Sequence, residues 1–189
     1  MNRALPPLVV TAQANADAAG FGLSCEPEVG WLLAALAASV PPGGRILDLG
    51  TGVGVGLAWM DYGLAVRRDV AIVSVDIDEQ IQASARALEW HVPVQFETGD
   101  AAELAGALGQ FDMIFADAPG GKIFKLGRTI GAMARGGILV VDDMDLTRHE
   151  DADLRQALTL VRERLLSNNE LACSELTFSS GVILAVKRR

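Results

Sequence analysis

Glycines and acidic residues in one short stretch, Ile46 to Gly56 (ILDLGTGVGVG), carry the first chemical signal of the chain. An apolar run is interrupted by Asp48, and glycines then recur at every second position from Gly50. This pattern predicts a buried strand that turns sharply into a helix, because glycine tolerates positive φ and lets a ligand approach the backbone. The start of such a helix offers unpaired N–H groups and a partial positive charge. A nucleotide-like ligand is therefore expected at this turn.

The glycine spacing excludes the dinucleotide fingerprint, which needs glycines at relative positions one, three and six. Counted from Gly50, the sixth position is Val55, and counted from Gly52 it is Leu57. The pattern instead resembles the first motif of class I S-adenosyl-methionine-dependent methyltransferases, an acid followed by alternate glycines. The resemblance implies that this cofactor contacts Asp48, Gly50, Thr51, Gly52 and Gly54. The alternative is a tight strand-to-helix turn in some other α/β protein.

Two further acidic turns lie where this cofactor would need them. Asp76 ends the apolar run VAIVSVD, and a carboxylate there can accept hydrogen bonds from both ribose hydroxyls, with Ile77 beside it. The alternative role is helix capping, for which Asp78 is better placed. Farther on, Asp100 and Ala101 belong to a GDA turn that is similar to the adenine-binding loop of the family. Capping of the following helix is an equal alternative for Asp100.

Five acids follow the carboxyl ends of predicted strands, where open parallel sheets bind their ligands. Two of them suit the cofactor, and nothing in the fold requires the others there. These five residues are Asp76, Asp100, Asp117, Asp142 and Asp143. Their convergence on one edge of the sheet is therefore more informative than any one of them.

The segments FDMIFADAPGGK (111–122) and GGILVVDDM (136–144) are similar to the fourth- and fifth-strand motifs of a narrower family. It comprises the cation-dependent O-methyltransferases related to catechol and caffeoyl-coenzyme A O-methyltransferases. The resemblance covers roughly residues 20–189 and implies that Asp117, Asp142 and Asp143 are metal ligands, with Asp117 also near the cofactor's reactive end.

Three carboxylates with water make an oxygen-rich site suited to Mg²⁺, Mn²⁺ or Ca²⁺. A divalent cation would hold a substrate hydroxyl and lower its pKa. Methyl transfer also needs the oxygen, methyl carbon and sulfur in line, so alignment supplies much of the catalysis. The resemblance, together with these acids, thus implies methyl transfer to a hydroxyl of a small molecule.

The general base is the least certain part of this pattern. Relatives commonly carry a lysine three residues after the fourth-strand acid, where this chain has Gly120. Lys122 is the candidate replacement, and a solvated lysine at a helix start is the alternative. His149 is a second candidate. Asp145 and its neighbours stand where relatives often have a tryptophan, which weakens the expectation of an aromatic substrate.

Composition narrows the function classes. The chain has 189 residues, a net charge of −8 and two cysteines, Cys25 and Cys173, without a CxxC metal pattern or a disulfide framework. Basic residues are scattered, which disfavours a nucleic-acid substrate. The longest apolar run near the N-terminus is too short to span a bilayer, and no signal-peptide pattern is present. A cytoplasmic protein with no membrane partner is expected.

Strands and helices alternate after residue 45, which predicts a Rossmann-like three-layer α/β sandwich. Its sheet has seven strands, mostly parallel, and a C-terminal hairpin adds an antiparallel edge. Helices are expected at about 27–38, 53–66, 79–91, 101–108, 122–134 and 151–167, and strands at about 45–49, 70–76, 94–98, 111–117, 137–142, 171–177 and 182–187.

The length fits one methyltransferase domain spanning 1–189. Residues 1–25 have few charges and no clear pattern, which indicates an N-terminal arm or lid, either flexible or disordered. Two other functions stay open: methyl transfer to RNA or an amine, and a non-catalytic S-adenosyl-methionine-binding module, which Gly120 would allow. The oligomeric state also stays open, a homodimer included.

Overall fold

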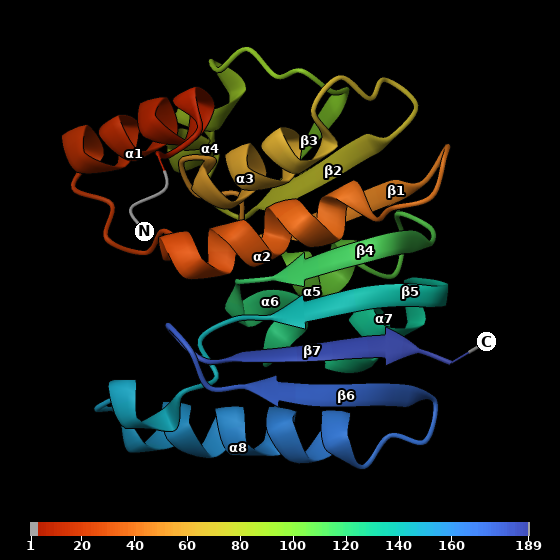
Figure 1. Ribbon diagram of the computed structural model, residues 1–189. Helices are drawn as coiled ribbons and strands as arrows, with labels where there is room; N and C mark the ends of the chain where they lie inside the picture. The colour runs from red at the N-terminus through yellow and green to blue at the C-terminus, as the bar shows by residue number, and fades with distance from the viewer. Residues whose placement is uncertain (1–3, 189) are drawn as a thin grey trace.

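The computed structural model describes residues 4–188. They form a seven-stranded sheet in the order β3-β2-β1-β4-β5-β7-β6, with helices on both faces (Figure 1). The strands are β1 (Arg45–Leu49), β2 (Ala71–Asp76), β3 (Val94–Thr98), β4 (Phe111–Ala116), β5 (Met133–Val141), β6 (Leu171–Leu176) and β7 (Val182–Lys187). The helices are α1 (Pro7–Ala19), α2 (Pro27–Ala38), α3 (Val55–Leu64), α4 (Glu79–Arg86), α5 (Ala101–Leu104), α6 (Pro119–Lys122), α7 (Leu126–Gly131) and α8 (Ala152–Leu166), with a 3₁₀ turn at Leu146–Arg148.

The first five strands pair in parallel, and β7 pairs antiparallel with both β5 and β6. Parallel pairing requires a crossover between strands, and helices in those crossovers cover both faces. The central strands β1 and β4 are therefore almost entirely buried. The predicted fold class is confirmed, including the antiparallel hairpin at the C-terminal edge.

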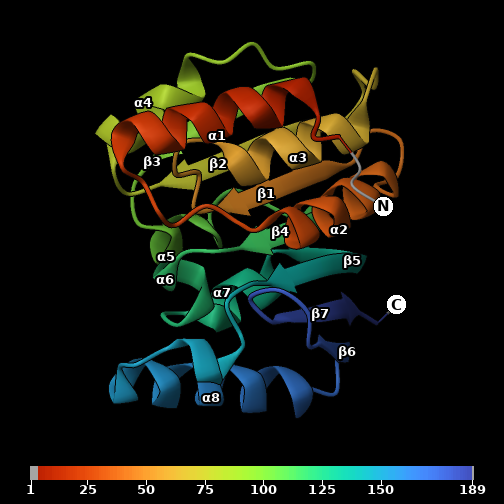
Figure 2. The same ribbon diagram turned by 60° about the vertical axis from the view of Figure 1, so that its left-hand side comes forward.

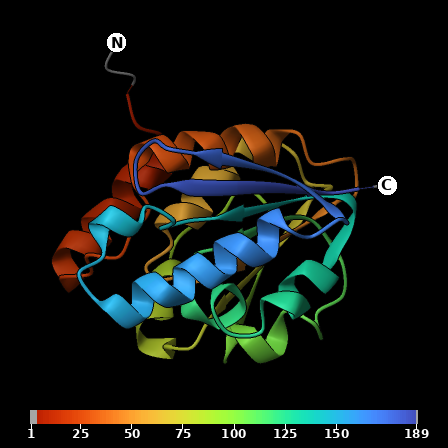
Figure 3. The ribbon, with the colours of Figure 1, turned by 90° about the horizontal axis from the view of Figure 1, so that it is seen from below.

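Two apolar clusters, one on each face of the sheet, form the core. One is built largely from α1, α2, α3 and the α4 region, and the other from α5, α7 and α8 (Figures 2 and 3). Glycine brings α2 and α3 into close contact: a Cβ on Gly63 would lie 2.1 Å from the Ala34 carbonyl oxygen. This packing holds the end of α3 against α2.

The N-terminal segment differs from the prediction of an irregular arm. Pro7 to Ala19 form helix α1, which begins at a proline and ends at Gly20 in the left-handed conformation. Val9, Ala12 and Ala16 lie one helical turn apart and are buried against the rest of the protein. Because two of these three buried residues are alanines, the buried face of α1 is hardly more apolar than its exposed face. The helical periodicity of hydrophobic residues in this segment is therefore weak. The part of the predicted arm in residues 1–3 lies outside the described residues, as does Arg189.

The helix predicted at 122–134 is also wrong. Two short helices, α6 and α7, replace it, and β5 already begins at Met133. Gly121 and Lys125 have positive φ, which a continuous right-handed helix does not allow. Met133 pairs with Phe111 ahead of a register shift in the sheet, and this pairing extends β5 backwards.

Two other predicted helices are shorter in the structure. The helix expected at 79–91 ends at Arg86, and the one expected at 101–108 ends at Leu104. After α4 the buried Asp61 carboxylate binds the N–H groups of His91 and Val92, which holds this segment out of helical geometry. Across residues 4–188, no helix combines the length and apolar character that crossing a lipid bilayer would require.

Candidate functional site

The carboxyl ends of β1, β2, β4 and β5 meet at one edge of the sheet. The chain order reverses direction between β1 and β4, which lie side by side at the centre. Crevices that bind ligands in open α/β sheets form at such a switch point. The predicted glycine loop and Asp117, Asp142 and Asp143 all lie at this edge.

The glycine loop runs from Gly50 to Gly54 between β1 and α3. Gly50, Gly52 and Gly54 all have positive φ, as the sequence pattern required. The N–H of Gly52 donates to a carboxylate oxygen of Asp76 at 2.7 Å, so the end of β2 anchors the loop. The other carboxylate oxygen of Asp76 accepts from the N–H of Asp78 at 2.9 Å.

A cavity of about 280 Å³, here called the glycine-loop cavity, opens above this loop. Its walls include the predicted residues Gly50, Thr51, Gly52, Asp76, Ile77 and Asp117. The structure therefore brings most of the predicted cofactor residues together. The ring of Phe21 closes the loop side, since a Cβ on Gly52 would lie 2.9 Å from two of its carbon atoms.

Asp48 lies beneath the glycine loop, and its contact with a cofactor stays a prediction. Its side chain is fully buried beneath the loop, and Ser74 Oγ donates to its Oδ2 at 2.6 Å. Thr51 Oγ1 lies 2.6 Å from the same hydroxyl and accepts from Gln82, so these polar groups form a buried chain. Burial raises the pKa of Asp48 to about 7. Asp48 does not line the glycine-loop cavity, so its side chain supports the loop from below.

Asp100 and Ala101 also lie outside the wall of this cavity. Asp100 caps α5 by accepting from the N–H of Ala102 at 2.8 Å. The capping role that the sequence allowed is therefore present. Contact of Asp100 and Ala101 with a cofactor stays a prediction.

Asp117, Asp142 and Asp143 form the acidic cluster. One carboxylate oxygen from each lies within 4.8 Å of the others. Burial raises the pKa of Asp117 well above its usual range, and it also raises the pKa of Asp142. Asp143 has a φ of +59°, an uncommon conformation for a residue with a side chain. Asp142 Oδ1 accepts from Ser180 Oγ and from the N–H of Asp143, which fixes its orientation.

The donor set of the acidic cluster fits a hard divalent cation. All three groups offer carboxylate oxygens, the ligands that Mg²⁺, Mn²⁺ and Ca²⁺ prefer. Burial raises the pKa of Asp117 and of Asp142, so their ionised forms need a positive charge to stabilise them. A bound dication would supply that charge.

Lys122 points into the acidic cluster. Its side chain is only 6% exposed, and its Nζ lies 3.4 Å from Asp143 Oδ2 and 4.0 Å from Asp117 Oδ1. Nζ also donates to the carbonyl oxygen of Asp142 at 3.2 Å. A solvated lysine, the alternative that the sequence left open, is therefore excluded.

Gly120, at the position where the sequence resemblance implies a lysine, is closely packed against α5. A Cβ at this position would lie 2.7 Å from Asp100 Oδ1 and 3.0 Å from the Ala102 nitrogen. No side chain fits there without moving α5. The turn of α6, with positive φ at Gly121, instead directs Lys122 inward.

A second cavity, of about 390 Å³ and here called the acidic cavity, contains the acidic cluster and Lys122. His149 lines it too, with Nε2 3.0 Å from the Asp143 carbonyl oxygen. Leu154, Leu158 and Ile123 supply aliphatic walls, and none of the described residues that line it is Trp, Tyr or Phe. The two cavities share the residues Leu23, Ser24, Cys25, Asp117 and Pro119.

Residues 20–26, here called the strap, form the wall opposite the sheet edge. Sequence reasoning did not assign any of them to the site, because no spacing pattern marks a non-repetitive segment before a helix. Glu26 ties the strap to distant elements through a pair of hydrogen bonds from Arg148 and one from Ser179. The hydrogen bonds from Arg148 lower the pKa of Glu26 to about 2.

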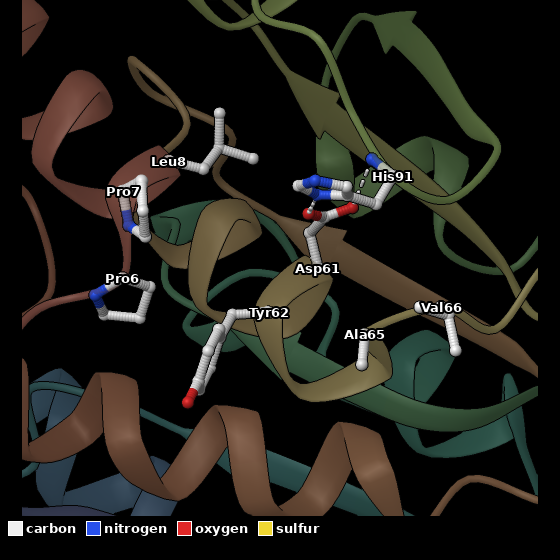
Figure 4. A pocket seen from close by; sticks show the side chains of 8 residues that line it. All are labelled: Pro6, Pro7, Leu8, Asp61, Tyr62, Ala65, Val66 and His91. Atoms are coloured by element: carbon white, nitrogen blue, oxygen red, sulfur yellow. Dashed lines mark hydrogen bonds and ion pairs between the residues drawn. The ribbon is translucent and has the colours of Figure 1, made fainter.

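A third cavity, of about 350 Å³, lies away from these groups, between the start of α1 and the end of α3 (Figure 4). Its lining includes Asp61 and His91, whose carboxylate oxygen and Nδ1 are 2.7 Å apart. The same carboxylate binds two backbone N–H groups. This pair holds the turn before β3 and is not part of the sheet-edge site.

Comparison with known proteins agrees with this geometry. A Mycolicibacterium smegmatis protein designated an O-methyltransferase is 31% identical over 194 residues, covering 95% of this chain and 90% of that protein. The chain belongs to the O-methyltransferase family. No protein-family model matches it.

Solved structures of O-methyltransferases share the fold. The Bacillus cereus O-methyltransferase was solved with S-adenosyl-homocysteine (SAH), and its structure matches with a TM-score of 0.83 at 20% identity. The match covers 98% of this chain and 92% of that one. TomG of Streptomyces achromogenes, an O-methyltransferase solved with SAM, has a TM-score of 0.83 at 22% identity over 98% and 92% of the two chains. These structures show the shared fold, and the Mycolicibacterium smegmatis relative confirms the O-methyltransferase family expected from the sequence.

Proposed function

We propose that this protein transfers the methyl group of S-adenosyl-methionine to a hydroxyl of a small molecule, with a divalent cation at the acidic cluster. The observation that carries the proposal is the wall shared by the two cavities, with Asp117 in it. A cofactor in the glycine-loop cavity and an acceptor in the acidic cavity would meet there. Both structural relatives described above were solved with this cofactor or its product.

On the cofactor side, Asp76 would bind the ribose hydroxyls, since its carboxylate lies in the wall of the glycine-loop cavity. Gly50 and Gly52 leave the loop without side chains that would block the approach. The strap closes the opposite side. These groups would orient the methyl group toward the acidic cavity, and alignment of this kind supplies a large part of the rate.

On the acceptor side, Asp117, Asp142 and Asp143 would hold the cation, which when bound supplies a positive charge that favours the ionised acceptor. Lys122 is the proposed base, because its nitrogen lies inside the cluster and is shielded from solvent. Its position favours catalysis over a non-catalytic binding module. The single-domain organisation of the chain belongs to the same proposal.

The test is turnover with labelled S-adenosyl-methionine and a panel of vicinal diols, with Mg²⁺ and with a chelator. We expect labelled methyl ether to form and the rate to fall on chelation. Labelled product on an amine or on RNA, with none on any diol, would contradict the hydroxyl acceptor. Binding of the cofactor without transfer to any acceptor would support the binding-module alternative.

A further inference from the structure

We infer that the Ser24 hydroxyl binds the acceptor oxygen at the point of methyl transfer, an inference that rests on the proposed function. Ser24 lies in the wall of both cavities. Within residues 4–188 its Oγ has no hydrogen-bond partner, and less than 1 Å² of its surface is exposed. A buried hydroxyl without a partner costs stability, so a ligand that pairs with it gains binding energy.

No structural role of Ser24 accounts for its hydroxyl group. It precedes α2, but the N-cap of that helix is Glu26, and no side chain caps it. Serine in such a segment ordinarily bonds to a nearby backbone group. The Ser24 Oγ makes no such bond in the described part of the chain.

The position of Ser24 is fixed at both ends of the strap. On one side, Phe21 donates its N–H to the Ala16 carbonyl at 2.9 Å, and its ring rests on Gly52. On the other side, Arg148 NH2 donates to Glu26 Oε1 at 2.5 Å. Ser24 is thereby held ready for a ligand at low entropic cost.

The chemistry at the shared wall selects the acceptor as the partner. Under the proposed function, the methyl carbon and the acceptor oxygen would meet beside the five shared residues. A sulfonium sulfur and its methyl group offer no ordinary hydrogen-bond donor or acceptor. The acceptor oxygen does, and Ser24 and Asp117 are the shared residues with oxygen in their side chains.

The experiment compares Ser24→Ala and Ser24→Thr with a matched control, Ser174→Ala, whose serine is exposed on β6. Catechol and 1,2-cyclohexanediol serve as acceptors with Mg²⁺ and saturating S-adenosyl-methionine. We expect Ser24→Ala to lower kcat/KM for the active diol about two- to thirteenfold, the net worth of one hydrogen bond. The Kd of S-adenosyl-homocysteine, measured by calorimetry, should stay within about twofold, and Ser24→Thr should recover part of the loss.

Weaker binding of S-adenosyl-homocysteine with unchanged kcat/KM would overturn the inference, because Ser24 would then serve the cofactor. Unchanged values for both would overturn it as well. If the wild-type protein methylates no acceptor, the proposed function fails, and the inference is judged from a crystal structure with S-adenosyl-homocysteine, Mg²⁺ and catechol. A catechol oxygen within 3.2 Å of Ser24 Oγ, a normal hydrogen-bond distance, supports it. A longer separation, or no bound catechol, overturns it.

Discussion

The Lys122 side-chain nitrogen donates to the main-chain carbonyl oxygen of Asp142 at 3.2 Å, across a separation of 20 residues. The contact joins α6 to the end of β5 and places this nitrogen among three carboxylates. The chain thus retains a lysine at the site although the usual position is occupied by glycine.

Replacing Lys122 with methionine should remove the proposed base and keep most of the buried volume. We expect turnover to fall by roughly 10²- to 10⁴-fold, the usual contribution of general base catalysis. Cofactor affinity should change little, because Lys122 does not line the glycine-loop cavity. The control is Lys125→Met, which alters an exposed lysine paired with Glu103. Equal rates for Lys122→Met and the wild-type protein would assign the base to another group, with His149 the next to test.

Gly120 should not accept the lysine that relatives carry. Gly120→Ala already places a Cβ 2.7 Å from Asp100 Oδ1, so we expect a loss of roughly 1–3 kcal/mol in the free energy of unfolding. Denaturant unfolding measures the change. Gly131→Ala is the matched control, because nothing lies within 4 Å of a Cβ there. If Gly120→Ala leaves the free energy of unfolding unchanged, α5 can shift at little cost to accommodate the added methyl group.

Asp142→Asn should abolish metal-dependent turnover and leave cofactor binding nearly intact. Asp142 lines the acidic cavity and not the glycine-loop cavity. Binding of Mn²⁺, followed by electron paramagnetic resonance, should weaken in this variant. Asp145→Asn is the control, a half-buried acid that caps the following turn. If chelator-treated protein methylates its acceptor at the untreated rate, the acidic cluster does not use a metal.

Asp76→Ala should weaken binding of S-adenosyl-homocysteine by roughly tenfold to a hundredfold, as expected for losing a hydrogen bond to a charged group. Part of the effect comes from the loop, since Gly52 loses its carboxylate partner. Asp78→Ala removes the neighbouring helix cap and serves as the control for local stability. Calorimetry with both variants separates the two effects. Tight NAD binding by the wild-type protein would contradict the cofactor assignment.

Asp48 should make folding stability fall as pH rises. Its pKa is about 7 in the folded protein against a usual value of 3.8, so between these values only the folded state keeps the proton. Stability from this group is full below about pH 4 and declines until about pH 7. Asp48→Asn keeps an acceptor for Ser74 without the charge. We therefore expect the Tm difference between this variant and the wild-type protein to grow in the variant's favour from pH 5 to pH 8. A difference independent of pH would contradict the buried charge.

The sequence by itself determined the alternation of strands and helices, the glycine loop and the acids at the strand ends. Each of these signals is local: β1 and β2 are short, mostly apolar runs, and glycine at positions 50 and 52 permits the positive φ values found there. The order of the acids along the chain was enough to place Asp117 and Asp142 at one edge, because parallel strands end on the same side.

Tertiary structure alone decided the inner arrangement of the site. Lys122 faces the acidic cluster because contacts of Gly120 with α5 and the turn at Gly121 set its direction. The strap joins the site through Glu26, whose partner Arg148 is 122 residues away in the chain. Asp48 lies beneath the loop because Ser74 on the neighbouring strand binds it. Contacts between residues so far apart leave no periodic trace in a single sequence, so only the folded chain shows them.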